Sequence, residues 1–181
     1  MKTLEIAEQG AFPSALAAPG RNPEIPEAMD AYGWLVGDWD LDVLHFWVDV
    51  ADRGLKAELH CAWVLEGRAI QDLWIMPRRG ERAGYDDRTT NMYGTTLRLW
   101  DPVLQAWRIT WLNPIAGQHL EQVGRRVGND VVQVGSLPDG IVTRWRFTEI
   151  RTNSFHWIGE ALAPDAKNWV LQGEFLARRR A

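Results

Sequence analysis

The sequence predicts an all-β protein, an antiparallel up-and-down barrel of about 8–10 strands. From Trp34 onward, short segments in which apolar and polar residues alternate are separated by turn signals such as Glu66-Gly67 and Asp139-Gly140. No segment longer than about three turns has the apolar spacing of an amphipathic helix. A barrel is the simplest arrangement for so many antiparallel strands, because closure removes the exposed edges of the sheet.

The first 31 residues differ in composition from the rest of the chain. Four prolines, the last of them Pro26, lie there among small residues, and this composition is unfavourable for the interior of a helix or of a central strand. We therefore expect an irregular N-terminal arm over residues 1–31, with one short helical turn at 26–29. A single β-barrel domain is expected over residues 32–181.

Ten strands are predicted in the barrel domain. Each strand is taken to end at the neighbouring turn residues, which places its boundaries to within about two to four residues. The predicted strands cover residues 35–47, 55–65, 68–76, 93–100, 106–113, 118–127, 130–135, 141–150, 154–160 and 168–178.

Charge and composition exclude several classes of protein. The chain has 20 Lys and Arg residues against 24 Asp and Glu residues, a net charge of -4, and so lacks a basic surface for nucleic acid or anionic membranes. It has no apolar run of about 18 residues, and Glu5 and Glu8 interrupt the stretch that would be apolar in a signal peptide. Cys61 is the only cysteine, which excludes intrachain disulfide bonds and cysteine-based zinc sites. We expect a cytoplasmic protein that binds neither nucleic acid nor membranes.

The start of the first predicted strand, Gly37-Asp38-Trp39, resembles the calycin superfamily, whose lipocalin-like barrels begin with a Gly-x-Trp of this kind. The resemblance implies that Trp39 plugs one end of the barrel and that a basic residue from the last strand lies across it. Here that residue is Arg179 or its neighbour Arg178. A guanidinium group stacked on an indole ring forms a favourable cation–π pair.

Three further segments, 63–68, 93–96 and 98–102, are similar to uncharacterised bacterial lipocalin-like proteins. The resemblance thus covers most of residues 33–180. Nitrobindins, the haem-binding relatives, continue after the tryptophan with a glycine-rich Gly-x-Gly pattern, whereas this chain has Asp40-Leu41-Asp42. This difference argues against haem as a cofactor.

Antiparallel pairing indicates which side chains face the barrel interior, since residues directly opposite each other point to the same side of a sheet. A two-residue turn at Glu66-Gly67 places Asp72 on the same face as Trp63 and Trp74. The two indole rings belong in the interior because of their apolar area. Asp72 is therefore expected inside the barrel with them.

The next hairpin places a cation on the same side. A four-residue loop at 102–105 turns Arg98 inward, whereas a five-residue loop would turn it outward. With the shorter loop, Arg98 lies close enough to Asp72 to interact directly or through one water. On the first strand His45 shares the face of Trp39, and it is the one histidine that we place inside.

These faces predict a cavity walled by tryptophan, of which the chain has 11 residues, more than Phe and Tyr together. Indole rings stack on planar aromatic or polyene molecules, and a few polar groups suffice to orient such a ligand. The side chains expected to contact the ligand are Trp63, Trp74, Trp111, Asn113, Gln122 and Trp157.

Three functions remain open for this cavity, of which binding of a small hydrophobic, aromatic ligand is favoured. In the second, the protein is a cofactor-independent isomerase, cyclase or lyase with Asp72 as general base, and Arg98 or His45 stabilises developing charge. In the third, the tryptophans only pack a structural or oligomerisation module. A structural ion pair between Asp72 and Arg98 is as compatible with the pattern as a catalytic pair.

No cofactor and no metal are expected. Glu58 and His60 lie two residues apart on one strand face, but no third ligand accompanies them, so we interpret this face as solvated. The sequence contains no phosphate-binding glycine loop, HExxH motif or nucleophile elbow. The expected partner is a small hydrophobic or aromatic molecule, and a homodimer is compatible with the sequence.

Overall fold

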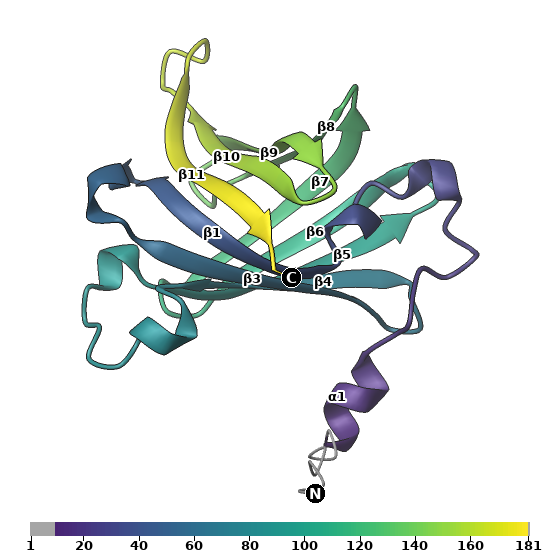
Figure 1. Cartoon of the computed structure of the whole chain (residues 1–181). Coiled ribbons are helices and arrows are strands. Elements are labelled where there is room, and N and C mark those ends of the chain that lie inside the picture. Colours follow the sequence, from purple (N-terminus) through teal and green to yellow (C-terminus); the bar gives the residue numbers. More distant parts are fainter. Residues whose placement is uncertain (1–9, 181) are drawn as a thin grey trace, which may run out of the picture.

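The computed structural model describes residues 10–180 and confirms the all-β, closed antiparallel barrel. Ten strands lie side by side in the order of the sequence, and the last pairs with the first to close the sheet (Figure 1). A further two-residue strand, β2, pairs only with the end of β1 and was not predicted. The strands are β1 (Gly37–Phe46), β2 (Val48–Asp49), β3 (Lys56–Val64), β4 (Ala69–Met76), β5 (Met92–Asp101), β6 (Ala106–Asn113), β7 (Gln118–Val127), β8 (Asp130–Ser136), β9 (Val142–Arg151), β10 (Ser154–Leu162) and β11 (Trp169–Arg179).

The helices of the described chain are all short. The longest, α1 (Ala11–Leu16), extends away from the barrel (Figure 1). Within residues 10–180 there is no helix with the length and apolar character needed to cross a membrane. The 3-10 helices are η1 (Glu27–Met29), η2 (Gly33–Leu35), η3 (Ala51–Arg53), η4 (Arg79–Glu81) and η5 (Arg88–Thr90).

The strand register agrees with the pairing that turn lengths predict. Cys61 on β3 lies opposite Asp72 on β4. Arg98 on β5 lies opposite Ile109 on β6, as the four-residue loop requires. Because paired residues share a face of the sheet, Asp72 and Arg98 both point into the barrel, and both are buried.

The segment that precedes β1 closes one end of the barrel. Ile25, Tyr32 and Leu35 from this segment are buried in the core, and η1 confirms the helical turn expected at 26–29. The description of the arm as irregular is incomplete, because α1 forms in it and Ala17 makes an antiparallel bridge to β3. Arm residues thus belong partly to the barrel core.

Trp39 lies at this closed end beneath the side chain of Arg179, as the Gly-x-Trp resemblance implies. The guanidinium carbon of Arg179 is 4.0 Å from the centroid of the Trp39 ring. The same guanidinium donates hydrogen bonds of 2.7 Å to the carbonyl oxygens of Trp34 and Val36. Arg179 therefore ties the last strand to the entry of the first, and the arrangement is consistent with a calycin-like barrel.

A β-bulge in β1 corrects the expected position of His45. The register shifts between Val43 and His45, so that Val43 lies opposite Phe175 but His45 lies opposite Glu174. Glu174 is on the outer face, where it binds His156, and His45 therefore points outward as well. The bulge turns Phe46 inward in its place.

Replacing Trp39 by Ala should destabilise the barrel by about 3–5 kcal/mol, because the ring is fully buried and anchors Arg179. Trp47→Ala is the matched control, since this ring is 50% exposed and its loss should cost less than about 1 kcal/mol. Urea unfolding of both variants measures the difference. Equal losses of stability would contradict the assignment of Trp39 as the plug.

Candidate functional site

A cavity of about 240 Å³ lies inside the barrel at the end opposite Trp39. Exposed residues such as Trp47 and His119 stand at its rim, so the cavity meets solvent there. Six aromatic rings stand in its wall, each from a different strand of the barrel. They are Phe46, Trp74, Trp111, Trp145, Trp157 and Phe175.

The aromatic wall is continuous from ring to ring. The centroid of Trp157 lies 5.5 Å from those of Trp74 and Trp145, and the ring of Trp145 lies 5.9 Å from that of Trp111. These distances and the tilted or edge-to-face angles are those of favourable aromatic pairs. Glycine makes this packing possible: a Cβ atom at Gly159 would lie 2.6 Å from the Trp157 ring.

Arg98 forms the floor of the cavity, and it is held there by an ion pair with Asp72. Nη1 of Arg98 donates to Oδ2 of Asp72 at 2.5 Å, and the N–H of Thr96 donates to Oδ1 at 3.0 Å. The side chains of Asp72 and Arg98 are 0% and 2% exposed. Burial acts to lower the pKa of Arg98, but the neighbouring groups, with the charge and hydrogen bond of Asp72 foremost, together raise that pKa. The guanidinium therefore stays charged in the interior.

Two glutamines extend this pair across the barrel. Nε of Arg98 donates to Oε1 of Gln133 at 3.4 Å, and Nε2 of Gln133 donates to Oε1 of Gln122 at 3.1 Å. Gln122 in turn donates to the hydroxyl of Thr143 at 3.4 Å. The polar layer, as we call Asp72, Thr96, Arg98, Gln122, Gln133 and Thr143, separates the plugged end from the cavity.

Tyr32 completes the polar layer from the plugged side. Its hydroxyl donates to Oε1 of Gln133 at 3.1 Å, and the guanidinium carbon of Arg98 lies 4.9 Å from the centre of its ring. Burial raises the pKa of Tyr32 far above its usual value, so the phenol stays protonated and keeps this donor. The segment that precedes β1 therefore positions Arg98 as well as closing the barrel.

The structure brings together some of the predicted site residues. Trp74, Trp111 and Trp157 line the cavity, and so does Arg98. Asp72 is in contact with Arg98 but lies behind it, outside the cavity wall.

Trp63, Asn113 and Gln122 are buried but are not part of the cavity wall. Trp63 packs 6.3 Å from Trp107 at the plugged end, because its place near the β3–β4 turn puts it at the far end of the barrel from the mouth. Gln122 is held within the polar layer, and Asn113 donates to Gln118 near the rim. Pairing alone gives the face of a residue and not its depth along the barrel axis.

Phe46, Trp145 and Phe175 line the cavity but were missing from the predicted site. Trp145 lies opposite Gly159. A glycine paired with a tryptophan indicates that the barrel has room for a large ring at this position, and this pairing could have identified Trp145 from the sequence. Phe46 was missed because of the bulge in β1, for which the sequence carries no turn or glycine signal.

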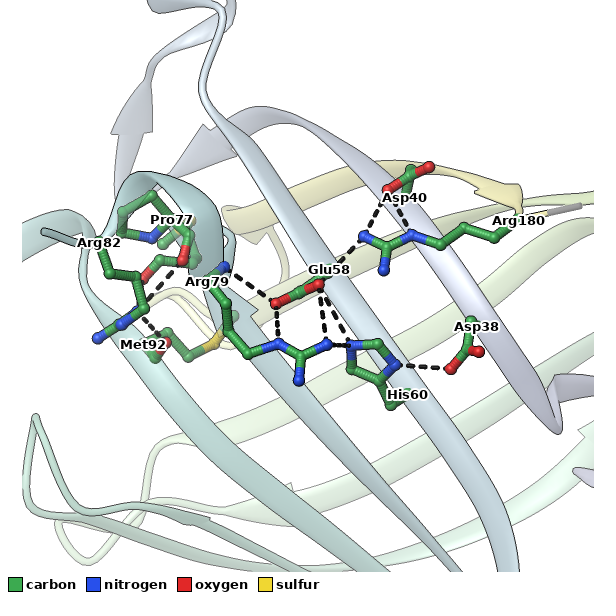
Figure 2. Close-up of polar contacts among 10 residues, drawn as sticks. Asp38, Asp40, Glu58, His60, Pro77, Arg79, Arg82, Met92 and Arg180 are labelled. Atoms are coloured by element: carbon green, nitrogen blue, oxygen red, sulfur yellow. Dashed lines mark hydrogen bonds and ion pairs between the residues drawn. The ribbon is translucent and has the colours of Figure 1, made fainter. Parts of the chain in front are cut away.

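A second cluster of charged groups lies on the outer face of β3 (Figure 2). Glu58 accepts hydrogen bonds from the main chain and side chain of Arg79, at 3.0 and 2.7 Å, and from Arg180 at 3.1 Å. His60 stands between Glu58 and Asp38, 3.3 and 2.6 Å from their carboxylate oxygens. The expectation of a solvated face is wrong for Glu58, which Arg79 covers to leave its side chain 5% exposed.

The outer cluster is an ion-pair network rather than a metal site. In the part of the chain that the structure describes, no group of three or more His, Cys, Asp or Glu residues is arranged to hold a metal ion. The two arginines occupy the oxygens of Glu58 that a metal would need. Burial would raise the pKa of Glu58, but the bonds from Arg79 and Arg180 lower it to about 2.

Comparison with known proteins does not assign a function to this site, because no protein-family model matches the chain and no curated protein matches it.

Cys61 offers no nucleophile, since burial raises the pKa of its thiol far above neutral pH. The arrangement can therefore enclose a small, mainly apolar molecule and present hydrogen-bond donors from the floor to a polar atom on it.

Changing Asp72 to Asn should destabilise the barrel by about 3–5 kcal/mol, because Arg98 would remain buried without its counter-charge. Combining Asp72→Asn with Arg98→Met should recover most of that loss, since the double variant buries no unpaired charge. Urea unfolding at neutral pH measures both effects. A single variant as stable as the wild type would show that the ion pair is not a structural element.

Changing Glu58 to Gln tests the outer cluster through pH. Because the pKa of Glu58 is lowered from 4.5 to about 2 by folding, its ionisation stabilises the native state fully above about pH 4.5, and the effect disappears as pH falls toward 2. At neutral pH, Glu58→Gln should cost on the order of 3 kcal/mol. The gap from the wild type should close in acid. Glu121→Gln, at an exposed position of β7, is the control and should show no such gap.

Proposed function

We propose that this protein binds a small hydrophobic, aromatic ligand in the open end of the barrel. The observation that carries the proposal is the cavity of about 240 Å³ with six aromatic rings in its wall. Protein interiors are close-packed, and an empty space of this size would destabilise a purely structural module without serving any function in it. A ligand that fills the space between the rings would recover that loss.

The volume limits the size of the ligand. An apolar cavity of about 150 Å³ in a protein core is enough to bind benzene. The larger cavity here has room for a planar molecule of about two fused rings. Access from the rim at Trp47 and His119 gives such a molecule a route of entry.

The position of Asp72 supports binding rather than turnover. A general base must reach the proton that it abstracts, within about 3 Å or through one water. The carboxylate of Asp72 is held by Arg98 and by the N–H of Thr96, and it lies behind the cavity wall. His45, the other predicted charge-stabilising group, points to the outer face.

Three further predictions from the sequence stay predictions. Membership of the calycin superfamily is proposed from Gly37-Asp38-Trp39 and from the stacking of Arg179 on Trp39. The cytoplasmic location and a homodimer rest on the sequence alone.

Leu120→Trp tests the proposed site by filling it. Leu120 lines the cavity opposite Trp111, and a larger side chain there should occupy the space of the ligand. We expect saturable binding of naphthalene to the wild type in isothermal titration calorimetry and loss of that binding in the variant. Leu99→Trp makes the same change on the outer face of β5 and should bind naphthalene like the wild type.

Absence of saturable naphthalene binding to the wild type would overturn the proposed function. Unchanged binding in Leu120→Trp would place the ligand outside this cavity. Thermal unfolding of the variant checks that it is folded.

A further inference from the structure

We infer that the ligand carries a neutral hydrogen-bond-accepting oxygen, such as an aromatic ketone, which binds against Arg98 at the floor of the cavity. This inference rests on the proposed function and adds the chemical class of the ligand to it. It follows from three features of the polar layer: the donors that remain on Arg98, the charge of the floor, and the apolar character of the wall.

The first feature is the donor capacity of Arg98. A guanidinium group has five N–H donors and no acceptor. The hydrogen bonds to Asp72 and Gln133 use Nη1 and Nε, each once, and Arg98 lines the cavity. The remaining N–H groups are desolvated by burial, so an acceptor atom that reaches them gains a charge-assisted hydrogen bond.

The second feature is the net charge of the floor. Among the cavity-lining residues that the structure describes, Arg98 is the only Lys, Arg, Asp or Glu. Asp72, 2.5 Å away, cancels its charge. A carboxylate ligand would bring a second negative charge beside Asp72 into a buried site and would lose its hydration without full compensation. A neutral oxygen meets the donors without that cost.

The third feature is the contrast between floor and wall. Thr96 and Thr143 are the other polar side chains of the polar layer that face the cavity, and their hydroxyl groups can also donate to a ligand oxygen. Above them the wall is formed by Trp74, Trp111 and Trp157 and the neighbouring rings. A ligand with one polar end and a planar apolar body therefore fits with its oxygen at the floor and its rings between the indole rings of the wall.

The test uses three naphthalene derivatives of similar size, each substituted at the β position of the naphthalene ring. Acetylnaphthalene has the ketone oxygen, isopropenylnaphthalene has a methylene group in place of that oxygen, and naphthoate has a carboxylate. Calorimetric titration of the wild-type protein should give roughly tenfold tighter binding for the ketone than for the alkene, as expected for one hydrogen bond to a charged donor. Naphthoate should bind more weakly than the ketone.

Two variants assign the preference to Arg98. The double variant Asp72→Asn with Arg98→Met removes the Arg98 donors from the cavity and both charges of the pair, and in it the ketone and the alkene should bind equally. Arg125→Met, at an exposed position of β7, is the matched control and should keep the wild-type preference. Melting curves establish that both variants are folded, and the wild-type series decides the question without any variant.

The outcomes separate this inference from the proposed function. Equal binding of ketone and alkene by the wild type would overturn recognition by Arg98 and leave the aromatic site intact. Tightest binding of naphthoate would overturn the preference for a neutral oxygen. Binding of none of the three compounds would overturn the proposed function together with the inference.

Discussion

The buried ion pair between Asp72 and Arg98 is the interaction on which the interior of this barrel depends. Ten strands enclose more space than apolar side chains fill here, and the pair with its glutamines divides that space into two parts. Below it, Tyr32 and the plug residues pack to full burial. Above it, the aromatic wall surrounds the cavity. The position of the ion pair and its glutamines therefore sets the boundary between the packed core and the cavity that a ligand can enter.

The aromatic wall shows how a strand barrel leaves room for a ligand without losing its packing. Trp157 lies over Gly159 and beside Trp145 and Trp74, and it occupies space that the glycine leaves free. The rings pack against one another in tilted or edge-to-face pairs. A cavity held in this way is preformed, and binding would need little rearrangement.

The ion pairs on the outer face of β3 connect it to distant segments of the chain. Arg79, from the segment between β4 and β5, covers Glu58, and Arg180 from the end of the chain reaches the same carboxylate (Figure 2). These contacts join the β4–β5 connection and the last strand to β3. Together with the stacking of Arg179 on Trp39, they hold the two ends of the sheet closed. The barrel thus uses arginine at its floor, its plug and its outer face.

The sequence by itself determined the succession of strands and the inward position of Asp72, because turn length and alternation act between residues close in the chain. It left two loop lengths open for the next hairpin, and the structure has the four-residue loop that turns Arg98 inward. The tertiary structure alone decided which buried residues line the cavity. Trp63 lies at the plugged end, and the bulge in β1 exchanges His45 for Phe46. Depth along the barrel axis and the bulge depend on the pairing of β1 with β11, strands separated by almost the whole chain, and on the arm that fills one end. Such contacts are set by packing among distant segments, and no local pattern of residues encodes them.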